Sequence, residues 1–300
     1  MIRKFAAAVI AALILSVLFV AVAPMKSPAA DCPNGGTVRM GVEPFEATAK
    51  LQPLYDQIGK MVGEKLGCNV QVFVATNYNA EIEAMRAGKL EIGEFGPLGY
   101  VLAHQVAHAE AVATFATPDG KKPSVYFASI VTKPGSGITS LSQVAGHSFA
   151  YSDPDSTSGH LFPAYGLRKN GIDPDTGIKA VYAGSHTASF EALKNGKVDA
   201  GELNSQMVDS AMASGQYRDG DFVTLWKSDP IPTDPITVRA DLPDSFKARV
   251  REAFLSIDLK KLDDHGIMKG FGYRFVPATD AMYQQIRDLV STLHIDLSKM

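Results

Sequence analysis

The sequence predicts an α/β protein of two similar lobes, each a mostly parallel sheet flanked by helices, with two crossover strands at a hinge. Three observations support this prediction. Residues 37–96 alternate between strand and helix patterns, a twelve-residue segment recurs later in the chain, and a proline-rich stretch at 228–236 leads the chain back to the first lobe. Two lobes that share two crossings can bend about the hinge, so we expect a clamshell that closes on a ligand.

The first lobe is predicted from two alternating periodicities. Apolar residues recur at helical spacing between Leu51 and Leu66, and a second, shorter helix ends at Gly88. Strand patterns precede, separate and follow these helices, at residues 37–42, 70–74 and 90–96. Such alternation is typical of a parallel sheet that is covered by helices on both faces.

The chain then repeats part of this unit. Residues 83–94 (EAMRAGKLEIGE) reappear as residues 191–202 (EALKNGKVDAGE), an offset of 108 positions from the first glutamate to its counterpart. A helix–glycine–strand corner can arise twice independently, but twelve matched positions favour a duplicated lobe. The same offset pairs Tyr78 with His186, each at the start of a helix that follows a strand. Ligands bind beyond the carboxyl ends of strands in open α/β sheets, so we expect both side chains at the cleft.

The segment richest in candidate ligand donors is residues 151–159 (YSDPDSTSG), between a short apolar strand and a helical pattern. The first N–H groups of a helix have no internal partner and carry positive partial charge, so they bind anions. Ser156, Thr157 and Ser158 add three hydroxyl donors at this point. A single hydroxyl here would be an ordinary N-cap. Three adjacent hydroxyls before a glycine exceed that need and favour a ligand site.

Two crossings should link the lobes. A strand at residues 126–131 leads into the second lobe, and the return passes through residues 222–226 and the prolines of 228–236. Asp234, in this return, is expected to face the cleft together with Glu43 at the end of the first strand. Helical patterns after residue 243 are expected to pack on the first lobe. The predicted division is 31–129 with 229–300 for the first lobe and 130–228 for the second.

Residues 1–30 have the pattern of a secretory signal peptide, with Arg3 and Lys4 before an uncharged run from Phe5 to Ala23. The run is long enough to span a bilayer, so an uncleaved membrane anchor stays open as an alternative. Cleavage removes three of the 29 basic residues and none of the 32 acidic ones, which moves the formal charge from −3 to −6. An acidic chain without a basic patch is not expected to bind nucleic acid.

The only cysteines are Cys32 and Cys68. In an exported chain they predict one structural disulfide between the mature N-terminus and the end of the first helix. His104 and His108 are spaced as a zinc pair, but the sequence supplies no third ligand near them. We therefore expect no metal and no cofactor.

Three motifs together resemble the phosphonate/phosphite/phosphate (PhnD-like) periplasmic substrate-binding proteins of ABC transporters: residues 153–159 (DPDSTSG), 184–186 (GSH) and 231–235 (IPTDP). Tyr78 and residues 95–100 (FGPLGY) fit the same family, and the resemblance covers nearly all of residues 37–290. It implies a type II periplasmic-binding-protein clamshell that is a monomer and not an enzyme. Such a protein captures a small phosphorus oxyanion and delivers it to an ABC permease in the inner membrane.

The resemblance also implies a ligand-binding set. The residues expected to hold phosphorus-bound oxygens are Tyr78, Tyr126, Ser156, Thr157, Ser158 and His186. In binders of 2-aminoethylphosphonate, acidic groups pair with the ligand amine; Asp234 matches one of them, whereas Gln206 stands where another carboxylate is expected. Glu94, beside Phe95, stands where an aromatic or apolar residue is expected. Glu94 therefore either replaces the lost amine partner or points away from the ligand.

Two other functions remain open from the sequence. A ligand sensor docked to a membrane receptor would use the same clamshell, and an uncleaved N-terminal run would favour it. A hydrolase would use Ser156 or Ser158 as nucleophile with His186 and either Asp153 or Asp234. The sequence lacks the Gly-x-Ser-x-Gly motif of one large hydrolase class, which weighs against this reading.

Overall fold

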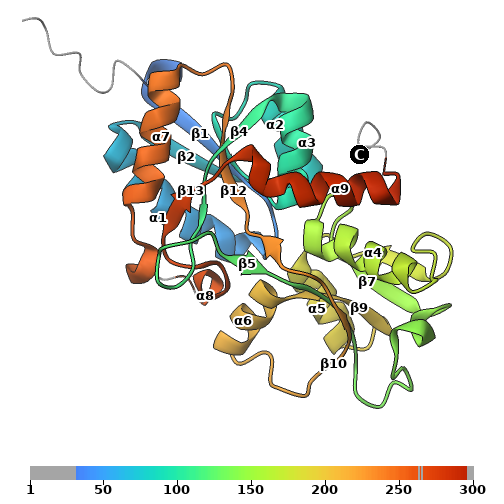
Figure 1. The fold of residues 1–300 in the computed structure, drawn as a ribbon. Helices are drawn as coiled ribbons and strands as arrows, with labels where there is room; N and C mark the ends of the chain where they lie inside the picture. Colours follow the sequence, from blue (N-terminus) through green and yellow to red (C-terminus); the bar gives the residue numbers. More distant parts are fainter. Residues whose placement is uncertain (1–31, 263, 265, 296–300) are drawn as a thin grey trace, which may run out of the picture.

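The computed structural model describes residues 32–262, 264 and 266–295, so the predicted signal segment 1–30 lies outside the described residues. The first lobe is built on a six-stranded sheet in the order β13-β4-β12-β3-β1-β2 (Figure 1). Strands β1, β2 and β3 form its parallel part, and β12 is antiparallel to both neighbours. The strand bounds are β1 Thr37–Val42, β2 Asn69–Val74, β3 Ile92–Glu94, β4 Ala109–Phe115, β12 Pro235–Arg239 and β13 Phe275–Pro277.

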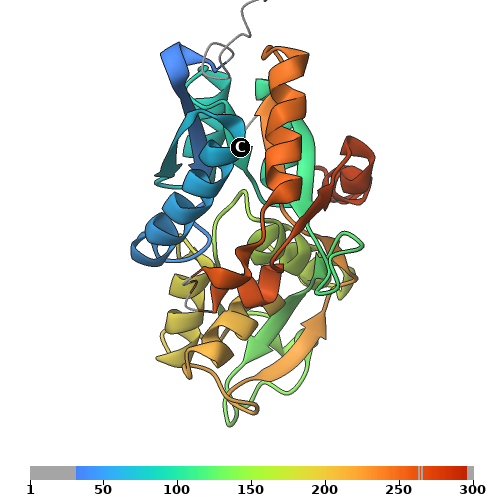
Figure 2. The same ribbon diagram turned by 90° about the vertical axis from the view of Figure 1, so that its left-hand side faces the viewer.

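Helices cover both faces of this sheet, as the alternation of periods predicts. The apolar stripe from Leu51 to Leu66 in α1 is buried and joins one core cluster, whereas α2 and α3 contribute to a second one. The helices that follow the strands of this lobe are α1 Thr48–Leu66, α2 Tyr78–Arg86, α3 Pro97–Ala107 and α7 Asp244–Ser256. Figure 2 shows α1 in blue and α7 in orange within the upper lobe.

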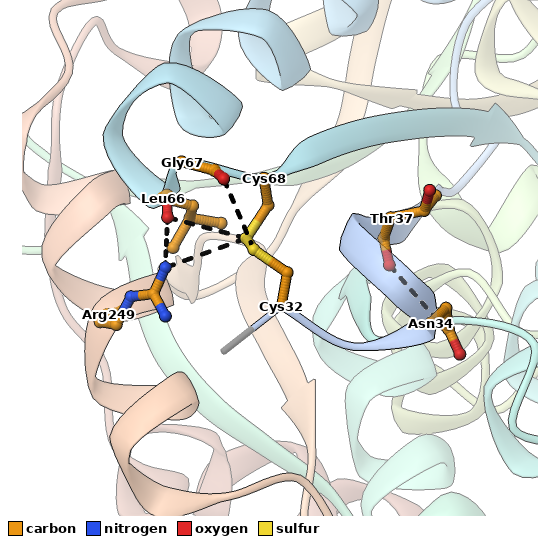
Figure 3. The surroundings of a disulfide bond; sticks show 7 residues. All are labelled: Cys32, Asn34, Thr37, Leu66, Gly67, Cys68 and Arg249. Atoms are coloured by element: carbon orange, nitrogen blue, oxygen red, sulfur yellow. Dashed lines mark hydrogen bonds between the residues drawn. A yellow bond between two sulfur atoms is a disulfide. The ribbon is translucent and has the colours of Figure 1, made fainter. Parts of the chain in front are cut away.

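The predicted disulfide between Cys32 and Cys68 is present, with 5.9 Å between the two Cα atoms (Figure 3). It ties the start of the described chain to the short connection between α1 and β2. Arg249 of α7 donates to the carbonyl of Leu66 beside this bond. The bond therefore lies at the amino-terminal end of β2, away from the carboxyl ends of the strands.

The second lobe has a five-stranded sheet in the order β10-β6-β9-β7-β8. Strands β7, β8 and β9 are parallel, and β6 runs antiparallel between β9 and β10. The strand bounds are β6 Ala128–Thr132, β7 Ser148–Tyr151, β8 Lys179–Tyr182, β9 Ala200–Asn204 and β10 Val223–Lys227. The helices are α4 Phe162–Lys169, α5 His186–Lys194 and α6 Ser205–Ala213, and a π-helical turn, η4 Thr157–Leu161, precedes α4. Both sheets are thus mixed, with a parallel unit in each.

The sequence repeat occupies equivalent places in the two lobes. Helices α2 and α5 are both nine residues long, and their first residues, Tyr78 and His186, are 108 positions apart. Gly88 and Gly196 follow them with φ of 68° and 65°, a left-handed conformation that favours glycine. Register agrees as well, because β1 pairs with β3 as β7 pairs with β9. The two parallel units are therefore copies of one arrangement.

The two crossings pair with each other. Strand β5 Val125–Tyr126 leads into the second lobe and β11 Ile231–Pro232 leads back, with Tyr126 opposite Ile231. The chain after α7 then contacts both lobes. Helix α8 Ile267–Phe271 packs on α6, and α9 Gln284–Leu293 lies on α3 and reaches η4 (Figure 1). Within the described residues no helix is both long and apolar enough to cross a membrane.

Candidate functional site

A cavity lies between the lobes, with about 500 Å³ of space free of protein atoms, including open solvent at its mouth. Its wall comes from the carboxyl ends of strands and the amino-terminal ends of the helices that follow. Glu43, Tyr78 and Gly96 come from the first lobe, and Ser156 and His186 from the second. Helix N-termini of both lobes therefore meet at one space, and their positive partial charge suits an anion.

Seven of the nine residues predicted to bind the ligand line this cavity: Tyr78, Tyr126, Ser156, Thr157, Ser158, His186 and Asp234. The other two, Glu94 and Phe95, do not line it. Phe95 is fully buried in a core cluster of the first lobe. We therefore leave Glu94 and Phe95 out of the ligand set proposed below.

The three hydroxyls at the start of η4, on its N-cap Ser156 and on Thr157 and Ser158, are buried, and each accepts a hydrogen bond from the protein. Ser156 Oγ accepts from the backbone N–H of Gly159 at 3.1 Å, and Ser158 Oγ accepts from Asn204 Nδ2 at 3.2 Å. Thr157 Oγ1 accepts from the backbone N–H of Leu98, in the other lobe, at 2.7 Å. A hydroxyl that accepts in this way keeps its own proton for another acceptor. Ser156 is an N-cap, as its position predicts, and the cap does not prevent it from donating to a ligand.

His186 has carboxylate on one side and the cavity on the other. Its Nδ1 lies 2.9 and 3.0 Å from the two carboxylate oxygens of Glu202, and its Nε2 lies 3.3 Å from Ser156 Oγ. Burial alone would lower the pKa of His186, but the charge and hydrogen bond of Glu202, with Asp234 and Glu46, raise it above its ordinary value. The ring therefore favours the imidazolium form, in which both nitrogens donate.

The tyrosines at the cavity are protonated donors. Burial, together with the charge of Glu43 and other acidic groups, raises the pKa of Tyr78 well above its ordinary value. Burial and the charge of Asp234 do the same for Tyr126. Each hydroxyl can thus donate to an oxyanion at neutral pH.

Three acidic groups also line the cavity, Glu43, Glu46 and Asp234, and burial shifts the pKa values of Glu43 and Asp234. Burial, followed by the charges of Glu81, Glu94 and Asp234, raises the pKa of Glu43 well above its ordinary value. Burial raises the pKa of Asp234 to about 7, although the nearby His186 acts in the opposite direction. Neither lysine nor arginine is among the described residues that line the cavity. The cavity therefore combines neutral donors, one histidine and carboxyl groups that hold protons readily.

Glu94 lies in the first lobe, among other buried carboxyls. It is 1% exposed and neither oxygen has a hydrogen-bond partner among the described residues. Burial and the charge of Asp234 raise its pKa well above the ordinary value, although the nearby Tyr55 hydroxyl partly offsets this. Glu94 therefore lies outside the cavity lining, in a cluster of acidic groups.

Several cavity residues were not among the predicted ligand-binding residues. Glu46 lines the cavity and accepts a hydrogen bond from Thr187 in the other lobe. Phe45, Met207 and Phe271 give part of the wall an apolar character. No local pattern distinguishes these residues from core residues. Glu202 does not line the cavity but contacts His186, which does. The sequence gives a signal for this residue, because it is the last residue of the repeated segment and the counterpart of Glu94.

Comparisons with known proteins identify the family. The family model "ABC transporter, phosphonate, periplasmic substrate-binding protein" matches residues 40–283. The chain is 28% identical to the phosphate-import protein PhnD of Mycolicibacterium smegmatis over 269 residues, covering 84% of each. It is 27% identical to the phosphonates-binding periplasmic protein of Escherichia coli over 289 residues, covering 94% of this chain and 84% of that protein.

A solved structure of PhnD1 from Prochlorococcus marinus, in complex with methylphosphonate, superposes with a TM-score of 0.76 at 22% identity. The match covers 86% of this chain and 98% of that one. This likeness confirms the two-lobed α/β fold class predicted from the sequence.

Proposed function

The chain belongs to the phosphonate-binding family of periplasmic substrate-binding proteins of ABC transporters, and from this premise we propose what it does. We propose that it captures a phosphonate, a phosphite or a similar phosphorus oxyanion between its lobes and delivers it to a membrane permease. The observation on which this depends is a set of buried donors from both lobes around one cavity: three hydroxyls at the start of η4, His186 and two tyrosines.

The donor set is sufficient for tight binding. A hydrogen bond to a charged group contributes about 1.5–3 kcal/mol. An oxyanion with two or three oxygens can accept several such bonds from η4, Tyr78, Tyr126 and His186, and the free N–H groups of helix termini add to the attraction. The sum of several such bonds, offset by lost motion and desolvation, is in the range of useful affinities.

The carboxyl group of Asp234, at the cavity wall, affects which protonation states of a ligand can bind. Asp234, whose pKa is about 7, is partly ionised at neutral pH. The ionised form repels a fully deprotonated oxyanion, but it accepts a hydrogen bond from a protonated phosphorus oxygen or from an amine. We propose that Asp234 selects protonated monoanions or amino-substituted phosphonates over sulfate, which carries no proton at neutral pH. The D234N variant should lose this discrimination, and an unchanged ligand order in D234N would contradict the role.

One geometric observation bears on the hydrolase alternative. Ser156, His186 and Glu202 follow one another in the order of a serine–histidine–acid triad, with Glu202 in place of the Asp153 or Asp234 that the sequence suggested. A triad needs a neutral imidazole that can take the serine proton. The raised pKa of His186 favours the imidazolium, which has no free lone pair for this step. We therefore propose binding without chemical change.

The family places its members in the periplasm, and we propose the same location for this chain. We also propose that it acts as a monomer and that an ABC permease in the inner membrane receives the ligand. A sensor docked to a membrane receptor would use the same cavity, and the N-terminal residue of the exported protein distinguishes an anchored from a released form.

Isothermal titration calorimetry tests the proposal. The ligands are phosphite, methylphosphonate, 2-aminoethylphosphonate, phosphate and sulfate. We expect saturable heat with at least one phosphorus compound, a weak response or none with sulfate, and loss of binding in the S156A/S158A variant. Absence of heat with all four phosphorus compounds would overturn the proposal. Incubation with methylphosphonate should release no phosphate, and release that depends on Ser156 would instead support the hydrolase.

A further inference from the structure

We infer that Glu202 sets the charge of the ligand cavity, as a positioning residue that holds His186 as a doubly protonated ring whose Nε2–H lies beside Ser156 Oγ at the cavity wall. This inference rests on the proposed function, since it identifies the positive charge that the oxyanion meets. Glu202 itself does not line the cavity. It acts on a ligand through His186 only.

The contact between the two side chains is close and shielded from solvent. Glu202 lies in β9 and is 0% exposed, and His186 begins α5 and is 5% exposed. Both carboxylate oxygens lie within 3.0 Å of His186 Nδ1, so rotation of the carboxylate would not break the contact. A buried carboxylate with a single ionic partner is stabilised mainly by that partner. In the same way, the carboxylate of Glu202 stabilises the imidazolium form of His186.

Other acidic groups face His186 from the neighbouring elements. Asp153 follows β7, Glu46 precedes α1, and Asp234 precedes β12, and each interacts with the ring through its charge. Burial raises the pKa of Asp153 and of Asp234, so these two hold a proton more readily than an ordinary aspartate. Among the described residues only Glu202 has a carboxylate that accepts a hydrogen bond from this ring. Its effect on the ring charge should therefore dominate.

The repeat supplies an internal comparison. Glu94 occupies the position of Glu202 in the first lobe, where the counterpart of His186 is Tyr78. Without a histidine, Glu94 has no cationic partner among the described residues, and its pKa is raised by burial and by Asp234, with the nearby Tyr55 hydroxyl acting in the opposite direction. The equivalent glutamates of the two lobes are thus neutralised differently, Glu94 by protonation and Glu202 by the imidazolium of His186. Only the second lobe gains a cationic donor in this way.

The consequence is a cavity with one cationic side chain. Because neither lysine nor arginine lines it in the described part of the chain, His186 is the lining side chain there that can be positively charged. Affinity for an oxyanion should therefore fall as pH rises through the pKa of His186. Without the Glu202 charge this pKa is lower, and the fall should occur at lower pH.

The test uses the full mature protein carrying E202Q, which keeps a side chain of the same shape and an oxygen that accepts from Nδ1 but removes the charge. The matched control is E191Q, which makes the same charge change on α5 away from the cavity lining. Two readouts are needed: the titration of the His186 ring by NMR without ligand, and the affinity for methylphosphonate between pH 5.5 and 8.5 by calorimetry. The ionisation of methylphosphonate itself is the same for all variants. The ratio of the affinities of two variants at one pH therefore reports only the difference between the proteins.

We expect the His186 ring of E202Q to lose its proton at lower pH than in the unmodified protein, and E191Q to leave it unchanged. At pH 7.5 the affinity of E202Q should fall about 10- to 100-fold, as expected when a charge-assisted hydrogen bond becomes a neutral one. At pH 5.5 the loss should be smaller. In an H186N background, E202Q should cause no pH-dependent loss.

An unchanged His186 titration in E202Q would overturn the inference. So would an affinity loss of the same size at every pH, which indicates a structural effect alone. E202D provides a further check, because a retained charge should restore part of the pH profile even if E202Q is poorly folded. If the unmodified protein binds no phosphorus compound, the proposed function fails, while the NMR titration still decides the role of Glu202.

Discussion

The backbone N–H of Leu98, at the start of α3 in the first lobe, donates a hydrogen bond of 2.7 Å to Thr157 Oγ1 in the second lobe. Helix α3 needs this acceptor because its own N-cap residue is Gly96, which has no side chain. The same hydroxyl lines the ligand cavity. A side chain expected to bind the ligand thus also holds the lobes together, which couples closure to binding.

The T157V variant removes this acceptor and one ligand donor while keeping a side chain of similar shape. We expect affinity for methylphosphonate to fall by about 1–2 kcal/mol, because both a cap and a ligand hydrogen bond are lost. Calorimetry gives the affinity, and small-angle scattering should show a larger radius of gyration for the ligand-free variant. T187V is the control, since Thr187 contacts Glu46 across the cleft without lining the cavity. Equal affinity losses in both variants would argue against a ligand contact of Thr157.

Buried carboxyls in the first lobe should make stability depend on pH. Burial, with the charge of neighbouring acidic groups, raises the pKa of Glu81 and Glu94 well above the ordinary value, and that of Asp234 is about 7. In the unfolded chain such groups titrate near pH 4. Above this pH the folded state binds more protons than the unfolded state, so stability should decrease as pH rises from about 4 through 7.

E94Q provides the test of this pH dependence, because it replaces an unpartnered carboxyl with a neutral group of similar size. We expect it to raise the free energy of unfolding at pH 8 by roughly 1–3 kcal/mol, since no buried charge then has to form. At pH 5 it should change stability little. Thermal unfolding of the two proteins at both pH values is the measurement. A lower melting temperature for E94Q at pH 8 would show that the carboxylate has a partner.

The Cys32–Cys68 bond joins residues 36 positions apart and should stabilise the first lobe through the unfolded state. Its loss in C32S/C68S should cost about 2–4 kcal/mol in urea unfolding. The affinity for methylphosphonate should not change, because the bond lies at the end of β2 opposite the cavity. Added reductant should bring the unmodified protein to the stability of the variant. A changed affinity would mean that the bond also positions the cavity wall.

Substitution of Gln206 by glutamate should change the preference between 2-aminoethylphosphonate and methylphosphonate. Gln206 lies in α6, lines the cavity, and its side-chain nitrogen has no hydrogen-bond partner among the described residues. Q206E places a carboxylate there, which can pair with a ligand amine. We expect the ratio of the affinities for 2-aminoethylphosphonate and methylphosphonate to rise about tenfold, the gain of one charge-assisted hydrogen bond. Q216E, an exposed substitution in the same lobe, should leave this ratio unchanged; if it does not, the effect comes from net charge.

Local patterns predict much of the fold. The repeat identifies α2 and α5 with their glycine ends, and the offset alone places Tyr78 and His186 at one cavity. The contacts of the C-terminal segment could not be predicted from local sequence patterns. Helical patterns after residue 243 predict helices there, but not that α8 packs on α6 of the second lobe. Such docking depends on surfaces that are distant in sequence.

The sequence by itself determined which groups are available: three hydroxyls at a helix start, a histidine and a tyrosine at repeat-equivalent positions, and the acidic residues around them. Only the tertiary structure decided the charge of these groups. Glu94 and Glu202 are equivalent in sequence, yet one meets no partner and the other meets His186. The physical reason is that the charge of a buried carboxyl depends on what packs against it, and those neighbours come from other parts of the chain.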